Sequence, residues 1–312
     1  MKTLKIKYLL PLFLIGACLA QSGEASAADK LRVVTTTNTL ASLTKEILGD
    51  TADIHHVASP SQNIHFIQPT PKDVLKMKKA RVLIHQGLDL EAWRDPLIVA
   101  SANPLFIGDA KGAIDVSKGV ALVEAPASLS RAGGDIHAYG NPHYAIDPEN
   151  AKIIMQNIVE GLFEMFPERA NEFKQKGDTW QAKIDDKMKE WQNRMAPYQG
   201  ANVVTYHKSW PYFLNRFGFV TIGELEPKPG IPPTPKHISE LIKEMKEKNV
   251  RLIIREEFNE AGTPRKLSQE TGVPVVTLLQ DVGEAKDSTD YISTIEHNIH
   301  LIEEALTKKE TK

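Results

Sequence analysis

The sequence contains almost no cysteine. Its 312 residues include one, Cys18, which lies close to the N-terminus. A single cysteine excludes an intrachain disulfide framework, and it excludes a structural metal site built from several thiolates. Any metal site in this chain would therefore have to use other ligands, and the 10 histidines are the first group to consider.

The sequence also lacks an excess of charge of either sign. Lys and Arg together number 38 and Asp and Glu number 40, while aromatic residues make up 7% of the chain. This balance gives no general attraction to nucleic acid or to an anionic membrane surface. The length is sufficient for two domains with sizeable cores, so we expect a globular protein that binds no nucleic acid.

Long hydrophobic runs are missing as well, except near the N-terminus. Lys2, Lys5 and Lys7 precede an apolar run from Tyr8 to Ala20, which is too short to span a bilayer comfortably. Ala25-Ser26-Ala27 follows as a small-x-small cleavage site. Residues 1–27 are therefore predicted to be a signal peptide, and the protein is expected to be exported to the periplasm.

A second processing pattern overlaps the first. Leu14-Ile15-Gly16-Ala17-Cys18 resembles a lipoprotein box, in which Cys18 would become the lipidated first residue and a membrane anchor. The Ala-Ser-Ala site is the better match, and cleavage there would leave a mature protein without cysteine.

Beyond residue 27, short buried strands alternate with amphipathic helices in each half of the chain. This pattern predicts an α/β protein of two lobes, each a small and mostly parallel sheet flanked by helices. Pro69-Thr-Pro-Lys72 and Pro233-Thr-Pro-Lys236 open comparable helices, each followed by a similar strand, which supports two lobes of like construction. The expected strands are 31–35, 53–57, 82–84, 105–107, 203–206, 251–254 and 275–279.

A long charged segment separates the two halves. Pro167 to Met195 carries Phe173, Trp180, Ile184, Met188 and Trp191 at helical spacing, and it has almost no β-branched residues. A helix of this length would extend about 40 Å and could join the lobes as a strut. The predicted division is residues 28–166 for the first lobe, 167–196 for the helix and 197–312 for the second lobe.

Three histidines and one aspartate share a position at a strand end or in a loop that enters a helix. They are His65, His143, His207 and Asp281, two from each half. Ligands of α/β proteins usually bind at such loops. If the lobes pack with their strand ends facing, these side chains can converge in the cleft, and three imidazoles with one carboxylate suit Zn²⁺.

Several segments of this chain resemble the metal-receptor family, the zinc and manganese substrate-binding proteins of ABC transporters. The resemblance covers nearly the whole mature chain, and the family has two α/β lobes joined by one long helix. It is carried by Asn63-Ile-His-Phe-Ile-Gln-Pro-Thr-Pro-Lys-Asp-Val74, Gln86-Gly-Leu-Asp-Leu-Glu-Ala-Trp93, Asn141-Pro-His-Tyr-Ala-Ile-Asp-Pro-Glu-Asn-Ala151, Tyr206-His-Lys-Ser-Trp-Pro-Tyr-Phe-Leu-Asn-Arg-Phe-Gly218 and Glu226-Pro-Lys-Pro-Gly-Ile-Pro-Pro-Thr-Pro235.

The resemblance implies a set of metal ligands. The first three family ligands fall on His65, His143 and His207. Manganese-type members have a glutamate at the third position, so His207 favours zinc, in agreement with the preference of manganese for oxygen donors. The fourth position falls on Asp281 through a loosely matching loop, and Glu256 or Glu257 are alternatives.

The sequence departs from the family pattern in three places. Asn63-Ile64 replaces a usual Asp-Pro, Gln86-Gly87 replaces a usual Asn-Gly, and the histidine-rich loop of many zinc receptors is missing, which leaves only His137 nearby. We expect His85 to pack beside its strand. The remaining histidines, His55, His56, His237, His297 and His300, are expected to be exposed or structural.

The resulting prediction is a monomeric binding protein without enzymatic activity, which captures a divalent metal, zinc before manganese, and delivers it to a membrane ABC permease. An exported zinc hydrolase with Glu256 or Glu257 as base is an alternative. The sequence contains no His-Glu-x-x-His helix and no Gly-x-Ser-x-Gly motif to support it. A metal chaperone or surface adhesin that serves no transporter would use the same site.

Overall fold

Two four-stranded parallel sheets form the framework of the two lobes. The computed structural model describes residues 30–108, 110–125, 137–228 and 230–310, so the predicted signal peptide and Cys18 lie outside the described residues. The strand orders are β2-β1-β3-β4 and β6-β5-β7-β8, and every pairing is parallel. The strands are β1 Leu31–Thr35, β2 Ala52–His56, β3 Val82–His85, β4 Ala113–Asp115, β5 Asn202–Thr205, β6 Val220–Glu224, β7 Leu252–Arg255 and β8 Val275–Thr277.

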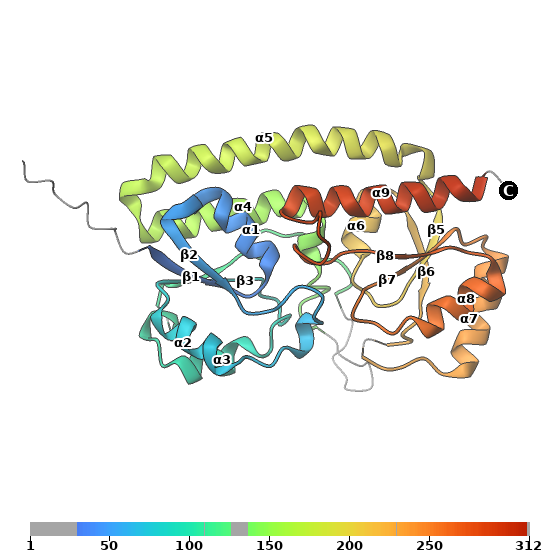
Figure 1. Cartoon of the computed structure of the whole chain (residues 1–312), viewed down its shortest axis with the longest axis horizontal. Helices are drawn as coiled ribbons and strands as arrows, with labels where there is room; N and C mark the ends of the chain where they lie inside the picture. Colours follow the sequence, from blue (N-terminus) through green and yellow to red (C-terminus); the bar gives the residue numbers. More distant parts are fainter. Residues whose placement is uncertain (1–29, 109, 126–136, 229, 311–312) are drawn as a thin grey trace, which may run out of the picture.

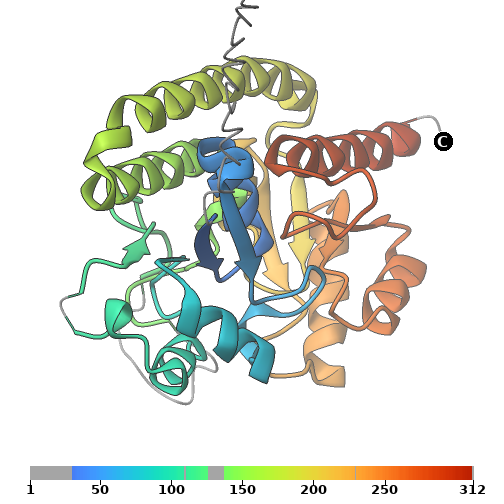
Figure 2. The same ribbon diagram turned by 60° about the vertical axis from the view of Figure 1, so that its left-hand side comes forward.

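The matching strand orders confirm the predicted fold class of two similar α/β lobes. In each sheet the first strand pairs with the second and third, and the fourth lies outside the third. Helices cover both faces of the sheets, with α2, α3, α7 and α8 on one side and α4, α5 and α9 on the other (Figure 2). The helices of the lobes are α1 Asn38–Leu48, α2 Pro71–Lys79, α3 Arg94–Ser101, α4 Pro148–Met165, α6 Pro211–Arg216, α7 Pro235–Glu247, α8 Gly262–Thr271 and α9 Tyr291–Glu310.

The long helix runs along both lobes. The predicted helix from Pro167 begins as a 3-10 turn at Pro167–Arg169 and continues as α5, Ala170–Met195. Figure 1 shows α5 above the two lobes, with α4 and α9 beneath it. Trp180 packs its ring edge-on against Tyr291 of α9, and Trp191 donates a hydrogen bond to Glu296 at 2.9 Å. The strut is therefore tied to the last helix of the chain.

The largest apolar core does not stop at the boundary between the lobes. It includes Val33 of β1 and Leu40 of α1 from the first half, together with Val203 of β5 and Phe213 of α6 from the second. The buried face of α5 belongs to the same core. Two smaller cores lie under the helices on the opposite faces of the sheets. The domain ranges predicted from the sequence remain a prediction.

Two strand predictions need correction. The expected strand at 105–107 is wrong, because Pro104–Phe106 forms a 3-10 turn in which Asn103 accepts a hydrogen bond from the Leu105 amide. The fourth strand of that sheet is β4 instead. The sequence analysis also missed β6, an edge strand that contains no buried residue. In the part of the chain that the structure describes, no helix has the length and apolar character needed to cross a membrane.

Candidate metal centre

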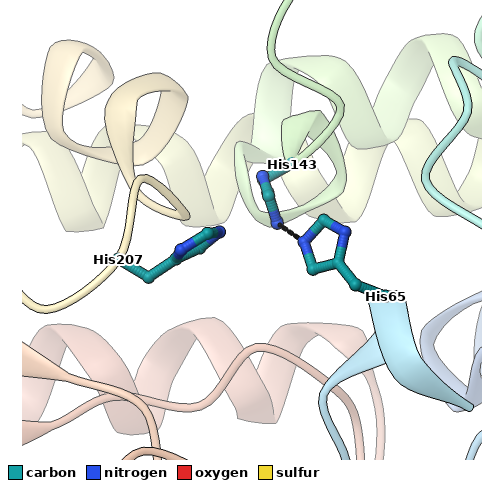
Figure 3. Close-up of side chains that lie close together, drawn as sticks. All are labelled: His65, His143 and His207. Carbon is teal, nitrogen blue, oxygen red and sulfur yellow. Dashed lines mark hydrogen bonds between the residues drawn. The ribbon is translucent and has the colours of Figure 1, made fainter. Parts of the chain in front are cut away.

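Three of the four predicted site residues converge between the lobes. His65 lies in the 3-10 turn Ile64–Phe66, His143 precedes the 3-10 turn Tyr144–Ile146, and His207 follows β5. Their rings point toward one another (Figure 3). One ligand nitrogen of each lies within 4.8 Å of the other two, and no other group of three such side chains occurs among the described residues. The first lobe thus contributes two imidazoles and the second lobe one.

The spacing of the rings resembles that of metal ligands. The Nε2 atoms of His65 and His143 are 3.0 Å apart, and the ring centroids of the three histidines are separated by 5.0, 5.3 and 5.6 Å. Two nitrogens bound tetrahedrally to zinc at 2.0–2.1 Å would lie about 3.3 Å apart. A hydrogen bond joins these two nitrogens, and their separation is close to that of two nitrogens on one zinc ion.

Asn141 orients His143. Its side-chain oxygen accepts hydrogen bonds from the His143 backbone amide at 2.9 Å and from ring Nδ1 at 3.0 Å. The Asn141 amide group in turn donates to the Lys208 carbonyl oxygen at 2.7 Å. The proton of His143 is thereby held on Nδ1, which leaves Nε2 as the atom that faces the cluster with a lone pair.

Glu226 orients His207 in the same manner. Its carboxylate accepts a hydrogen bond from His207 Nδ1 at 2.7 Å and also contacts the Gly230 amide at 3.2 Å. A carboxylate on the outer nitrogen fixes the tautomer of a ligating imidazole and raises its basicity. The sequence analysis quoted Glu226 only as part of a family segment and assigned it no role. The one sequence feature that could have pointed to Glu226 is the proline-rich loop that begins with this residue.

The turn that carries His65 is fixed by its flanking residues. The Asn63 side chain accepts a hydrogen bond from the His65 amide at 3.0 Å, and Trp93 Nε1 donates to the Ile64 carbonyl oxygen at 2.7 Å. Asn63, a departure from the family pattern, therefore still caps its turn. Thr70 and Asp73 form a reciprocal capping box that starts α2 just beyond.

His65 and His143 favour their neutral form. Burial, followed by the nearby imidazoles of His207 and His137, lowers the pKa of the His65 ring to about 3. Burial, followed by the nearby imidazoles of His65, His207 and His137, holds the pKa of His143 well below its usual range. Neutral imidazoles present lone pairs, which a divalent cation requires of its nitrogen ligands.

Asp281 lies outside this group of three. It lines the same cavity as His143, but its oxygens accept hydrogen bonds from the Asn38 amide at 3.1 Å and from the Thr39 amide and hydroxyl at 2.5 and 2.6 Å. Asn38 also donates to the Val282 carbonyl oxygen at 2.6 Å. The Asp281 carboxylate thus closes the N-terminus of α1 and joins the first lobe to the loop after β8.

The two alternative acids also lie outside the group. Glu256 is fully buried and accepts hydrogen bonds from Trp210 at 2.8 Å and Asn259 at 2.7 Å, whereas Glu257 is exposed and pairs with Arg255. The structure gives other partners to several remaining histidines. His55 pairs with Asp73, His85 with Arg94, His237 with the Glu224 carbonyl oxygen and His297 with Asp287.

Comparisons with known proteins identify the family of this chain. Residues 33–305 match the family described as zinc-uptake complex component A, periplasmic. The chain is 26% identical to the manganese ABC transporter substrate-binding lipoprotein PsaA of Streptococcus anginosus, over 97% of this chain and 99% of that one. It is 27% identical to the iron-binding protein YfeA of Yersinia pestis, over 92% and 89%.

A solved structure supports the same fold. The crystal structure of ZnuA superposes with a TM-score of 0.75 at 20% identity, over 89% of this chain and all of that one. Because the family match extends over most of the sequence, this protein belongs to the family of the periplasmic zinc-uptake component ZnuA, the metal-receptor substrate-binding proteins of ABC transporters.

Proposed function

We propose that this protein captures one zinc ion between its lobes and delivers it to a membrane permease for import. As a substrate-binding component of a metal ABC transporter, it has a divalent metal as ligand and a permease as partner. The relatives bear the names of different metals, manganese and iron among them, so the family alone does not select zinc.

The observation that supports zinc is the nitrogen content of the cluster. His65, His143 and His207 contribute three imidazoles, and no carboxylate oxygen belongs to the group among the described residues. Imidazole suits zinc, whereas manganese prefers oxygen donors. Glu226 and Asn141 further support metal ligation. Each accepts a hydrogen bond from Nδ1 of a cluster histidine, which leaves Nε2 for the metal.

A zinc-dependent hydrolase would need an available base beside the metal. Glu256, a base of the alternative hydrolase, already accepts two hydrogen bonds within the core. These features support a binding protein and not a hydrolase.

Asp281 remains the proposal that the sequence makes for the fourth ligand. Its carboxylate accepts hydrogen bonds from the amides of Asn38 and Thr39, and its remaining lone pairs could still bind a metal. For the exported protein, an intact mass separates cleavage after Ala27 from lipidation of Cys18.

The test compares metal content and competitive binding of the purified mature protein with His65→Ala, His143→Ala and His207→Ala. His300→Ala, at an exposed position of α9, is the matched control. We expect one zinc per chain in the wild type and the control, with affinity at least about 100-fold weaker in each cluster variant. This value is the upper end of the loss of metal affinity that follows when only a residue hydrogen-bonded to a metal ligand is removed. Unchanged zinc binding in all three variants would overturn the proposed site.

A further inference from the structure

The turn that carries His143 is held at both of its ends by the second lobe. Asn141 precedes His143 and Asp147 follows it, and both lie shortly before the first turn of α4 or at its start. Their partners lie in α6 or just before it, at intervals of four residues, and are Lys208, Tyr212 and Arg216. An inference about these contacts rests on the proposed function, because it presumes that His143 binds the metal.

The first end of the turn is held through Asn141, the residue that orients the His143 ring. The buried Tyr212 donates its hydroxyl proton to the Asn141 carbonyl oxygen at 2.7 Å. The Lys208 carbonyl oxygen accepts a hydrogen bond from the Asn141 side-chain amide, also at 2.7 Å. Lys208 directly follows His207 in the chain, so this bond joins the segment of one cluster histidine to the segment of another.

The second end of the turn is held through Asp147. Arg216 donates two hydrogen bonds to the Asp147 carboxylate, from Nε at 2.9 Å and from a terminal nitrogen at 3.0 Å. The Asp147 side chain is 4% exposed, and it also accepts a hydrogen bond from the Glu149 amide at the start of α4. A bidentate arginine fixes the orientation of a carboxylate as well as its position, and a buried carboxylate needs such a partner.

The first lobe contacts the same turn at a different point. The Tyr144 hydroxyl donates to the Gln86 carbonyl oxygen at 2.5 Å, between the two ends that α6 holds. The turn of His65, in contrast, is fixed by hydrogen bonds from side chains of the first lobe. The contacts at Asn141 and Asp147 therefore relate the place of His143 to the second lobe, which also carries His207.

We propose that Tyr212 and Arg216 are positioning residues, which hold His143 at the separation from His207 that a shared zinc ion requires. The ring centroids of these two histidines lie 5.3 Å apart, and neither positioning residue belongs to the group of candidate ligand atoms. A site that is already held in its binding geometry loses less conformational freedom when the metal binds, so its affinity is higher. The second lobe thus controls two of the three imidazoles, although only one of them follows a strand of its sheet.

The experiment compares the full mature chain with Tyr212→Phe, Arg216→Gln and Arg216→Lys. Tyr212→Phe and Arg216→Gln are each also combined with His143→Ala, which is made alone as well. The matched control is Arg194→Gln, because the Arg194 guanidinium likewise pairs with carboxylates, two glutamates of α9, but does not contact the His143 turn. Zinc affinity is measured by competition with chelating dyes, and melting curves of the metal-free variants report whether each one folds.

We expect Tyr212→Phe and Arg216→Gln each to bind zinc about three- to tenfold more weakly than the wild type. This loss is smaller than the roughly 10–100-fold that follows removal of a residue bonded to the ligand itself. Arg216→Lys should lose less, since it keeps the charge without the bidentate geometry, and Arg194→Gln should keep wild-type affinity. In the His143→Ala background neither change should weaken zinc binding further, because both act through His143.

The outcomes separate this proposal from the proposed function. Wild-type zinc affinity in both Tyr212→Phe and Arg216→Gln, with loss of binding in His143→Ala, would refute the positioning role and leave the three-histidine site intact. Losses that add to that of His143→Ala would also refute it, because they would indicate a general structural effect. If Arg216→Gln does not fold, Tyr212→Phe decides the question, since it removes only a hydroxyl group. If His143→Ala binds zinc normally, the proposed function itself fails.

Discussion

Glu226 offers a sharp test of how the second lobe holds the metal. Its carboxylate lies 2.7 Å from His207 Nδ1 and does not belong to the group of candidate ligand atoms. Its replacement is therefore expected to change metal affinity mainly through the orientation and basicity of His207. Two variants divide the contact into parts, since Glu226→Gln retains an oxygen acceptor without charge and Glu226→Ala removes the acceptor.

The size of the effect follows from the geometry. Hydrogen bonds with an ionised partner are roughly twice as strong as neutral ones. Loss of a residue that is hydrogen-bonded to a metal ligand typically lowers metal affinity about 10–100-fold. We expect about tenfold weaker zinc binding for Glu226→Gln and up to about 100-fold for Glu226→Ala. These losses correspond to about 1.4 and 2.8 kcal/mol of binding free energy.

The assay is zinc competition at neutral pH, with Glu257→Gln as the control. Glu257 follows β7, is exposed and pairs with Arg255, so its neutralisation leaves the three-histidine cluster unchanged. Melting of the metal-free variants verifies that the lobes still fold. Zinc affinities within threefold of the wild type for both Glu226 variants would refute the argument that His207 needs a charged partner.

Two further predictions concern stability. Free zinc at 100 times its dissociation constant stabilises the native state by about 2.7 kcal/mol. We therefore expect zinc to raise the Tm of the wild type by about 5–10 °C. An equal rise in His65→Ala would contradict the proposed site. Burial and the Arg94 charge lower the pKa of His85 to about 4. The unfolded state therefore binds more protons between pH 6.5 and 4, and up to about 3 kcal/mol of stability present above that range is lost as pH falls through it. The urea midpoints at pH 7.5 and 4.5 should differ by less in His85→Leu than in the wild type, and an unchanged difference would refute this.

The sequence could predict what depends on apolar periodicity and on strand ends. Buried runs such as Val82–Ile84 identified most strands, and the apolar face of α5 identified the strut. Carboxyl ends of parallel strands meet at one edge of a sheet, so histidines that follow such strands could be expected to converge. His65, His143 and His207 do converge, although their action as metal ligands stays a proposal.

The sequence could not predict contacts that depend on missed or distant elements. The residues of β6 alternate too weakly in hydropathy to be recognised, since Val220 is exposed and none of the five is buried. Glu226 reaches His207 only because β6 pairs with β5, so its role was missed with the strand. The hydrogen bonds of Asp281 to α1 join residues more than 240 positions apart, and no local pattern reports them.

The continuous core beneath α5 makes the two halves poor modules for recombination. A second lobe exchanged with that of a manganese-binding relative would bring a complete ligand loop. It would also place a foreign surface against Trp180 and Trp191, whose rings now lie against α9 or bond to it. Changes of metal preference in such a protein are therefore most accessible through single substitutions in the loops, where the core is not disturbed.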